Sequence, residues 1–220
     1  MCFSATASFV AGSALSVVGV VTITKVRKKA EIPFAMIPLL FGVQQISEGF
    51  IWLSFRLNAS LLNIAMTYVY SVFSHVLWPI FVPFAVGLLE IVSWRKKVIS
   101  GFQVVGIAVG LYFLYFIVRI PLTSQIVNKS IVYNSPHFYI IPALIAYFAA
   151  TCVSSLFSSH KLINIFGIVT LLAAAATYWF YASSFVSVWC FFAAILSIMI
   201  FLYFICLCCI HHYNKHMAVK

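Results

Sequence analysis

The residues whose chemistry is least expected in an apolar chain lie in the segment FGVQQISEGFIWLSF, residues 41–55. Glu48 occurs there beside Gln44, Gln45 and Trp52, and it is one of only three acidic residues in the chain. A carboxylate in hydrocarbon costs about 2.5–3.5 kcal/mol on insertion scales. Such a group usually persists because a ligand binds to it or because an ion or substrate moves past it. Glu48 is therefore the first candidate for a functional residue.

The rest of the chain predicts that this carboxylate lies in a membrane. Of 220 residues, 65% are hydrophobic and 7% are charged, and the mean hydropathy is +1.13. A soluble domain has about 25% charged residues. Apolar runs of about 20 residues, each long enough to span a bilayer, predict an all-α integral membrane protein. We expect one domain, residues 1–220, with seven transmembrane helices at about 8–25, 33–55, 64–89, 98–122, 138–157, 162–181 and 185–210.

The distribution of basic residues predicts the orientation of these spans. Loops after the first, third and fifth spans and the C-terminal tail contain ten of the thirteen Lys and Arg residues, whereas the opposite side contains only Arg56, Arg119 and Lys129. Basic residues accumulate in cytoplasmic loops. We therefore expect the N-terminus outside and the C-terminus in the cytoplasm. The net charge of +10 is then a signal of topology, and it does not by itself indicate a nucleic-acid partner.

With this orientation, scarce polar residues from distant parts of the chain fall on one side. A rise of about 1.5 Å per residue places Cys2, Glu48, Arg119, His137 and Cys190 in the outer half. His75 lies just beneath them, near the midplane. The sequence therefore predicts a polar pocket that opens to the outer face of the membrane.

The polar residues of that pocket are candidates for catalysis and for metal binding. Glu48 and His75 are candidate catalytic residues, as ligand, general base or proton shuttle. A catalytic zinc site needs three N, O or S ligands and one open position, and the candidate ligands are Glu48, His75, His137, Cys2 and Cys190. The alternatives are a polar network that only joins helices, or a contact for protons or substrate. No HExxH spacing is present to select zinc.

Other residues are candidates for binding a substrate. Arg119 could hold an anionic group, although an Arg that extends to the membrane interface is the alternative. Tyr68, Trp52 and Trp189 are expected to line the pocket. Pro79 and Pro83 are expected to kink the third span below His75.

One further acidic residue, Glu90, lies at the cytoplasmic end of the third span, just before the basic run WRKK. We interpret it as an ion-pair partner of Arg95, Lys96 or Lys97 at the membrane interface. It is therefore not expected to belong to the outer pocket.

Several familiar mechanisms are excluded or weakened by composition. The chain contains no Asp, which argues against aspartate-based intramembrane proteases. The last span contains no Lys that could form a retinal Schiff base, and neither a GxSxG nor a P-loop motif occurs.

Four segments, MCFSATASF, IPLLFGVQQISEGFIW, HVLWPIFVPFAVGLLE and SVWCFFAA, together resemble an uncharacterised bacterial family of small polytopic membrane proteins. The resemblance covers essentially the whole chain and implies an architecture without an activity. It implies a bacterial inner membrane, with the pocket facing the periplasm. The residues that it places in recognisable motifs are Cys2, Ser4, Glu48, Trp78, Pro79, Glu90, Trp189 and Cys190.

Three functions follow as hypotheses from these residues. The first is a metal-dependent, zinc-like membrane enzyme that acts on a lipid or amphiphile bound in the outer-half cavity. The second is a transporter or receptor for a small molecule or ion. The third is a structural membrane protein, or one that binds a partner.

Overall fold

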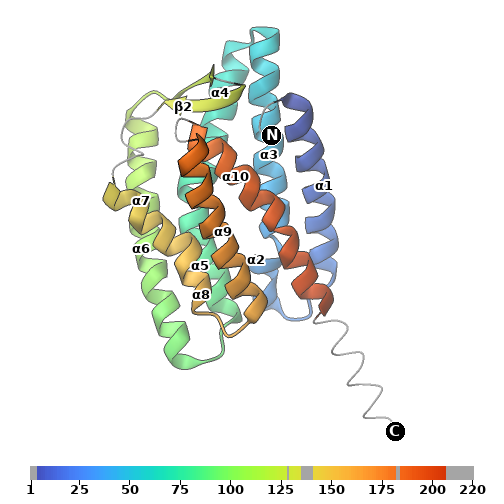
Figure 1. Ribbon diagram of the computed structural model, residues 1–220, viewed down its shortest axis with the longest axis vertical. Helices are drawn as coiled ribbons and strands as arrows, with labels where there is room; N and C mark the ends of the chain where they lie inside the picture. Colours follow the sequence, from blue (N-terminus) through green and yellow to red (C-terminus); the bar gives the residue numbers. More distant parts are fainter. Residues whose placement is uncertain (1–3, 128, 135–140, 182–183, 207–220) are drawn as a thin grey trace.

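The computed structural model describes residues 4–127, 129–134, 141–181 and 184–206. Long helices lie alongside one another and run alternately up and down, and a short β-hairpin crosses one end of the bundle (Figure 1). Among the described residues, six helices are long and apolar enough to cross a membrane, and residues Ile141–Leu156 form a shorter apolar helix. The helical class and six of the seven predicted spans are confirmed in length and composition.

Helices α1 (Ala5–Thr24) and α3 (Ile37–Leu57) pack closely because glycines lie at their contact. A Cβ added to Gly12 would lie 2.9 Å from the carbonyl oxygen of Gly42, and one added to Gly42 would reach Ser16. Small residues allow membrane helices to approach in this way, so that van der Waals contacts replace the hydrophobic effect. Since α1 has much of its remaining surface exposed, this contact holds it to the bundle.

The second span does not begin as one continuous helix. A 3₁₀ turn, η1 (Lys29–Glu31), leads into a short helix, α2 (Ile32–Ala35), and α3 follows. Glu31 closes this turn, because its carboxylate accepts hydrogen bonds from the backbone N–H groups of Arg27, at 2.9 Å, and Lys28, at 3.2 Å.

The third span consists of α4 (Ser60–Ser71), a π-helical segment, η2 (Val72–Leu77), and α5 (Trp78–Leu89). The π-helical segment lies directly before Pro79, whose missing N–H cannot bond the carbonyl of His75. Pro83 likewise leaves the carbonyl of Pro79 without its helical donor. That carbonyl lies against Gly106, where any side chain would overlap it. Where a kink was expected near the prolines, the structure has a widened helical turn that contains His75.

Helix α6 (Ser93–Arg119) leads to an antiparallel hairpin, β1 (Thr123–Val127) and β2 (Ser130–Asn134). Both strands lie between the fourth and fifth predicted spans. Ile131 and Tyr133 on β2 are buried, so this strand faces the bundle, and Ile126 pairs with Ile131 across the ladder. The hairpin thus covers one end of the helices.

The last part of the bundle contains α7 (Ile141–Phe148), the π-helical segment η3 (Ala149–Val153), α8 (Ser154–Leu156), α9 (Lys161–Tyr181) and α10 (Phe185–Leu196). After a turn at Ser197, helical residues continue to Cys206. Gly167 of α9 allows close contact with the carbonyl of Cys152, at 2.9 Å from an added Cβ. The predicted continuation to residue 210 lies outside the described residues.

Candidate functional site

Glu48 lies in the interior of the bundle with no exposed surface. The hydroxyl of Ser187, from α10, donates a hydrogen bond of 2.5 Å to its Oε1 atom. The two residues are 139 positions apart in the chain, so this bond joins α3 to α10. Hydrogen bonds to a carboxylate are short and strong in such surroundings.

Cys190 extends this polar cluster by one turn of α10. Its thiol lies close to the side chains of Gln44, Tyr70 and Glu48. Gln44 in turn accepts a hydrogen bond of 2.7 Å from the indole N–H of Trp78. We call Gln44, Glu48, Tyr70, Ser187 and Cys190 the polar core.

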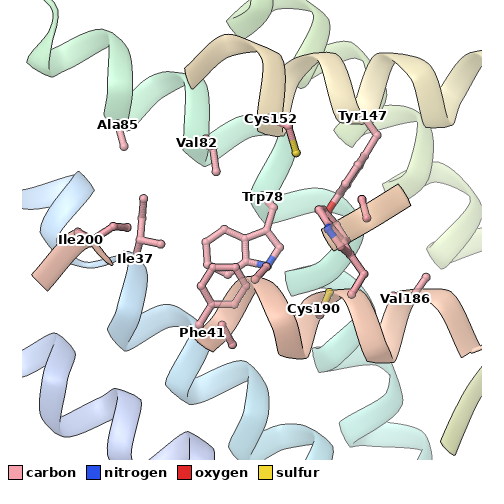
Figure 2. Close-up of a cluster of buried hydrophobic side chains, with 14 of the residues drawn as sticks. Ile37, Phe41, Trp78, Val82, Ala85, Tyr147, Cys152, Val186, Cys190 and Ile200 are labelled. Atoms are coloured by element: carbon pink, nitrogen blue, oxygen red, sulfur yellow. The ribbon is translucent and has the colours of Figure 1, made fainter. Parts of the chain in front are cut away.

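Aromatic rings line the side of the polar core towards α5. Trp78 stacks on Phe41 with 3.9 Å between ring centroids, and Figure 2 shows this pair with Cys190 and Tyr147 near it. Tyr147 interacts with Cys190 as well. The polar side chains are therefore enclosed by rings that exclude bulk water.

His75 lies in the π-helical segment and is 5% exposed. Its Nδ1 atom lies 2.7 Å from the Ser74 hydroxyl and 3.2 Å from the Ser71 carbonyl. Tyr147 donates a hydrogen bond of 2.6 Å to the Ser74 carbonyl, which fastens α7 to the widened turn. Since π-helical turns recur at functional sites, His75 is a candidate on local geometry as well as on residue type.

The hairpin closes the polar core from the end that was expected to be open. Tyr133 of β2 stacks on Tyr70 with ring centroids 4.6 Å apart and planes within 6°. Thr67 donates to Ser124, and Ser124 donates to Asn63, which ties β1 to α4. Glu48 is fully buried, so the described residues form a buried polar core, and its opening to the outer face stays a prediction.

The residues expected to bind substrate are dispersed. Trp52 and Trp189 are buried, and Trp189 donates a 3.3 Å hydrogen bond to the Thr170 carbonyl. The hydroxyl of Tyr68 instead accepts a bond from the backbone of Leu122, at 3.4 Å, near the hairpin. Arg119 is exposed over the ring of Tyr115, at 5.7 Å, and so lies outside the polar core.

The expected zinc ligands do not converge within the described part of the chain. There, no group of three or more His, Cys, Asp and Glu residues is arranged to hold a metal ion. Glu48, His75 and Cys190 therefore do not by themselves form the predicted centre. The remaining candidates, Cys2 and His137, lie outside the described residues.

Glu90 was expected to form an ion pair with the basic residues that follow it, but its carboxylate is bound by other groups. Its carboxylate accepts hydrogen bonds from the Ser159 N–H and hydroxyl, both at 2.6 Å, and from the Val92 N–H at 2.9 Å. Burial raises the pKa of this carboxyl, but the hydrogen bonds from Ser159, Val92 and Ile91 outweigh it and lower the pKa below 4.5. Glu90 thus joins α5 to the turn before α9.

Three spaces adjoin the polar core and His75. A groove of about 480 Å³ between α7 and α9 has apolar walls that include Leu144, Phe148, Leu171 and Phe185. A small space of about 20 Å³ lies between His75, Tyr147 and Trp189. Another of about 20 Å³ lies between Trp78, Thr170, Trp189 and Cys190. Each small space has room for about one water molecule.

Tyr70, Tyr133, Tyr147 and Thr170 were not singled out from the sequence. Tyr70 lies between Tyr68 and His75 in the sequence, and the π-helical turn changes which residues face inward. The β-branched and aromatic residues of SIVYN were the available signal for a strand that contains Tyr133. No local pattern marks Tyr147 or Thr170, because their neighbours come from other helices.

These features describe a helical bundle with six helices, among the described residues, that are long and apolar enough to cross a membrane, a buried polar core and a groove on its flank. Residues 1–207 match a family model described as "Family of unknown function (DUF6629)", so the chain belongs to that family. The family assignment agrees with the resemblance to an uncharacterised family. Comparisons with curated proteins and with solved structures gave no match.

Proposed function

We propose that this protein binds a lipid or another single-chain amphiphile from the bilayer. The apolar chain of the ligand lies in the groove between α7 and α9. The groove volume of about 480 Å³ falls within the range of about 300–1,000 Å³ typical of small-molecule sites. An acyl chain suits a groove with almost wholly apolar walls on the flank of a membrane-spanning bundle.

One observation carries this proposal: the groove and the small space at His75 have walls in common. Leu144, Phe148 and Phe185 line both. Behind these side chains lie Ser74, His75 and Tyr147. Apolar sites with a few convergent polar groups are the usual form of a ligand site, and movement of Phe148 or Phe185 would connect the two volumes.

A transport function has less support from the residues below His75. On α5 the buried side chains towards the inner end are apolar, among them Val82, Ala85, Val86 and Leu89. A translocation pathway for an ion or polar solute is usually marked by polar or ionisable residues. Catalysis by a metal has no three-ligand group among the described residues to support it, so binding is the function that we propose.

The groove can be filled by mutation without disturbing the helix contacts. Ala175 lines it and is exposed, so in Ala175→Trp the indole should occupy the volume that an acyl chain takes. We expect this variant to bind a fluorescent fatty-acyl probe at least about tenfold more weakly than the wild type, measured on purified protein in nanodiscs.

Ala176→Trp is the matched control, because Ala176 is the next residue of α9, is exposed, and is not among the residues that line the groove. It should bind the probe as the wild type does. Equal binding by the wild type and both variants would show that the probe does not use the groove and would contradict the proposal.

A further inference from the structure

Resting on the proposed function, we infer that the ligand is a lipid of one leaflet only, the leaflet at the end of the bundle that carries the β-hairpin. The polar head of the ligand lies beside the exposed aromatic residues that end α9, and the end of its chain lies beside Leu171, near the bilayer midplane. We call these aromatic residues the aromatic tip; they are Tyr178, Trp179, Phe180 and Tyr181. The leaflet and the direction of the ligand follow from where the groove and this tip lie together.

Helix α9 provides a scale of depth for the groove. Its 21 residues, Lys161–Tyr181, make it about 30 Å long, which matches the hydrocarbon thickness of a bilayer. Leu171 lies ten residues from both ends of this helix, and so about 15 Å from either interface. The residues of α9 that line the groove begin at Leu171 and continue only towards the aromatic tip, as far as Tyr178. The groove therefore lies in one half of the membrane thickness.

The other walls of the groove lie in the same half. Phe185 is the first residue of α10, so it lies at the end of the bundle where α9 ends. Leu144 and Phe148 belong to α7, which follows strand β2 of the hairpin in the chain. Figure 1 shows the hairpin at the end where α9 ends and α10 begins, and α10 contacts β2. The groove thus opens to the leaflet at the hairpin end.

The aromatic tip marks the level of the headgroups in this leaflet. Tyr178, Trp179 and Phe180 are 66%, 83% and 75% exposed. Successive residues of a helix point in different directions, because one turn takes 3.6 residues, so this end of α9 projects from the described part of the bundle. Trp and Tyr are enriched at membrane interfaces, where their rings lie at the level of the headgroups. Because Tyr178 also lines the groove, the groove ends at that level.

The opposite interface is marked by a different tryptophan. Trp94, near the start of α6, is 57% exposed and lies close in the chain to exposed Lys96 and Lys97. Arg95 donates a hydrogen bond of 2.8 Å to the Ser158 carbonyl, which places this part of α6 beside the turn before α9. The groove stops half-way along α9 from that turn. A lipid of the opposite leaflet would therefore reach the groove only with the end of its chain.

The headgroup is expected at the mouth of the groove because the adjoining internal space is too small for it. That space, at His75, has a volume of about 20 Å³, which is close to the minimum that holds one water molecule. It has room for a single hydroxyl or carbonyl oxygen on the chain, with Ser74, His75 and Tyr147 around it. A polar headgroup beside the aromatic tip keeps its contact with water and avoids the cost of burial.

Two photoreactive hexadecanoic acids test the direction of the ligand. One carries a diazirine close to the carboxyl group, and the other carries it at the far end of the chain. Each is irradiated with wild-type protein in nanodiscs, and the labelled residues are identified by mass spectrometry. Label that is lost in Ala175→Trp and kept in Ala176→Trp is assigned to the groove, which separates it from general contact with the bilayer.

We expect the first probe to label the aromatic tip and the second to label residues near Leu171. Because the head of a lipid stays at the interface of its own leaflet, this pattern identifies the leaflet. The reversed pattern, or the same pattern from both probes, would overturn the inference and leave the groove as a binding site. If neither probe labels the groove, the proposed function itself fails.

Variants then test the aromatic tip. Tyr178→Leu combined with Trp179→Leu removes two amphipathic rings and keeps the surface apolar, so the label from the first probe should spread from the tip along the groove. Trp94→Leu is the matched control, because it removes an exposed ring at the opposite interface, and it should give the wild-type pattern. An unchanged pattern in the double variant, or equal spreading in the double variant and the control, would contradict the role of the tip.

Discussion

Glu48 and Glu90 are both buried carboxylates, and their surroundings assign them different roles. Glu90 accepts hydrogen bonds from Ser159 and Val92, which fix a turn at one end of the bundle. Glu48 lies among side chains from several helices and close to Cys190, which lines an internal space. The first arrangement is suited to holding the fold together, and the second is suited to responding to a ligand.

The hydrogen bonds to Glu90 make stability depend on pH. Its pKa is lowered in the folded state from the ordinary value of 4.5, so the unfolded state binds the proton more readily. The stabilisation from Glu90 is therefore complete above pH 4.5, and it is lost as the pH falls through the pKa that Glu90 has in the folded protein. We expect wild-type protein in detergent to exceed Glu90→Gln in melting temperature at neutral pH, with the difference shrinking in acid.

Ser159→Ala provides the control for this prediction, because it removes the hydroxyl donor and leaves the backbone donors in place. It should show a smaller acid-dependent loss than the wild type. A difference between wild type and Glu90→Gln that stays constant from neutral to acid pH would contradict the role of these hydrogen bonds.

The helices were predictable from the sequence to within a few residues, whereas the departures from helix were not. Long apolar runs with a basic residue at one end or both mark α1, α6 and α9 clearly, because each must match the thickness of a bilayer. The π-helical segments η2 and η3 depend on packing between helices, and the hairpin depends on the surface that it covers. These are tertiary effects that hydropathy does not report.

The same distinction holds for the candidate site. The depth of Glu48, Cys190 and His75 follows from topology and could be inferred, because each span has a fixed direction. The bond between Glu48 and Ser187 depends on how α3 and α10 are rotated about their axes. Closure by Tyr133 depends on the hairpin. Residue types therefore indicated the region, but not whether it was open.

At the scale of elements, Gly106 lies at a close contact between α5 and α6. Gly106 packs against the carbonyl of Pro79, and an added methyl group would overlap that oxygen. Because both partners at the contact are backbone, little relief is available by side-chain movement. We expect Gly106→Ala to destabilise the folded protein by about 1–3 kcal/mol, measured as a lower melting temperature in detergent.

Gly101 on the same helix is the matched control for this substitution, since nothing lies within 4 Å of a Cβ added there. Gly101→Ala should be neutral or stabilising by up to about 1 kcal/mol, because alanine favours the helix. Equal losses in the two variants would mean that helix propensity, and not the Pro79 contact, determines the effect.

At the scale of the whole molecule, the distribution of charge agrees with the shape of the bundle. The hairpin and the end of α3 lie at one end in Figure 1, and the turns after α1, α5 and α8 lie at the other. Exposed basic residues concentrate at the second end. They are Lys25, Arg27, Lys28, Lys29, Lys96, Lys97 and Lys161.

This asymmetry predicts that the hairpin end faces outward, because basic residues are retained on the cytoplasmic side. A C-terminal fusion to green fluorescent protein expressed in bacteria should then fluoresce, and a C-terminal fusion to alkaline phosphatase should be inactive. Replacing the run Lys28–Lys29 and Lys96–Lys97 with Gln should weaken this bias, whereas replacing Arg56 and Lys129 with Gln should preserve it. An active phosphatase fusion to the wild-type protein would show that the orientation is the reverse of the predicted one. The polar core would then lie nearer the cytoplasmic surface. The proposal for the groove would be unaffected, because the groove opens towards the membrane in either orientation.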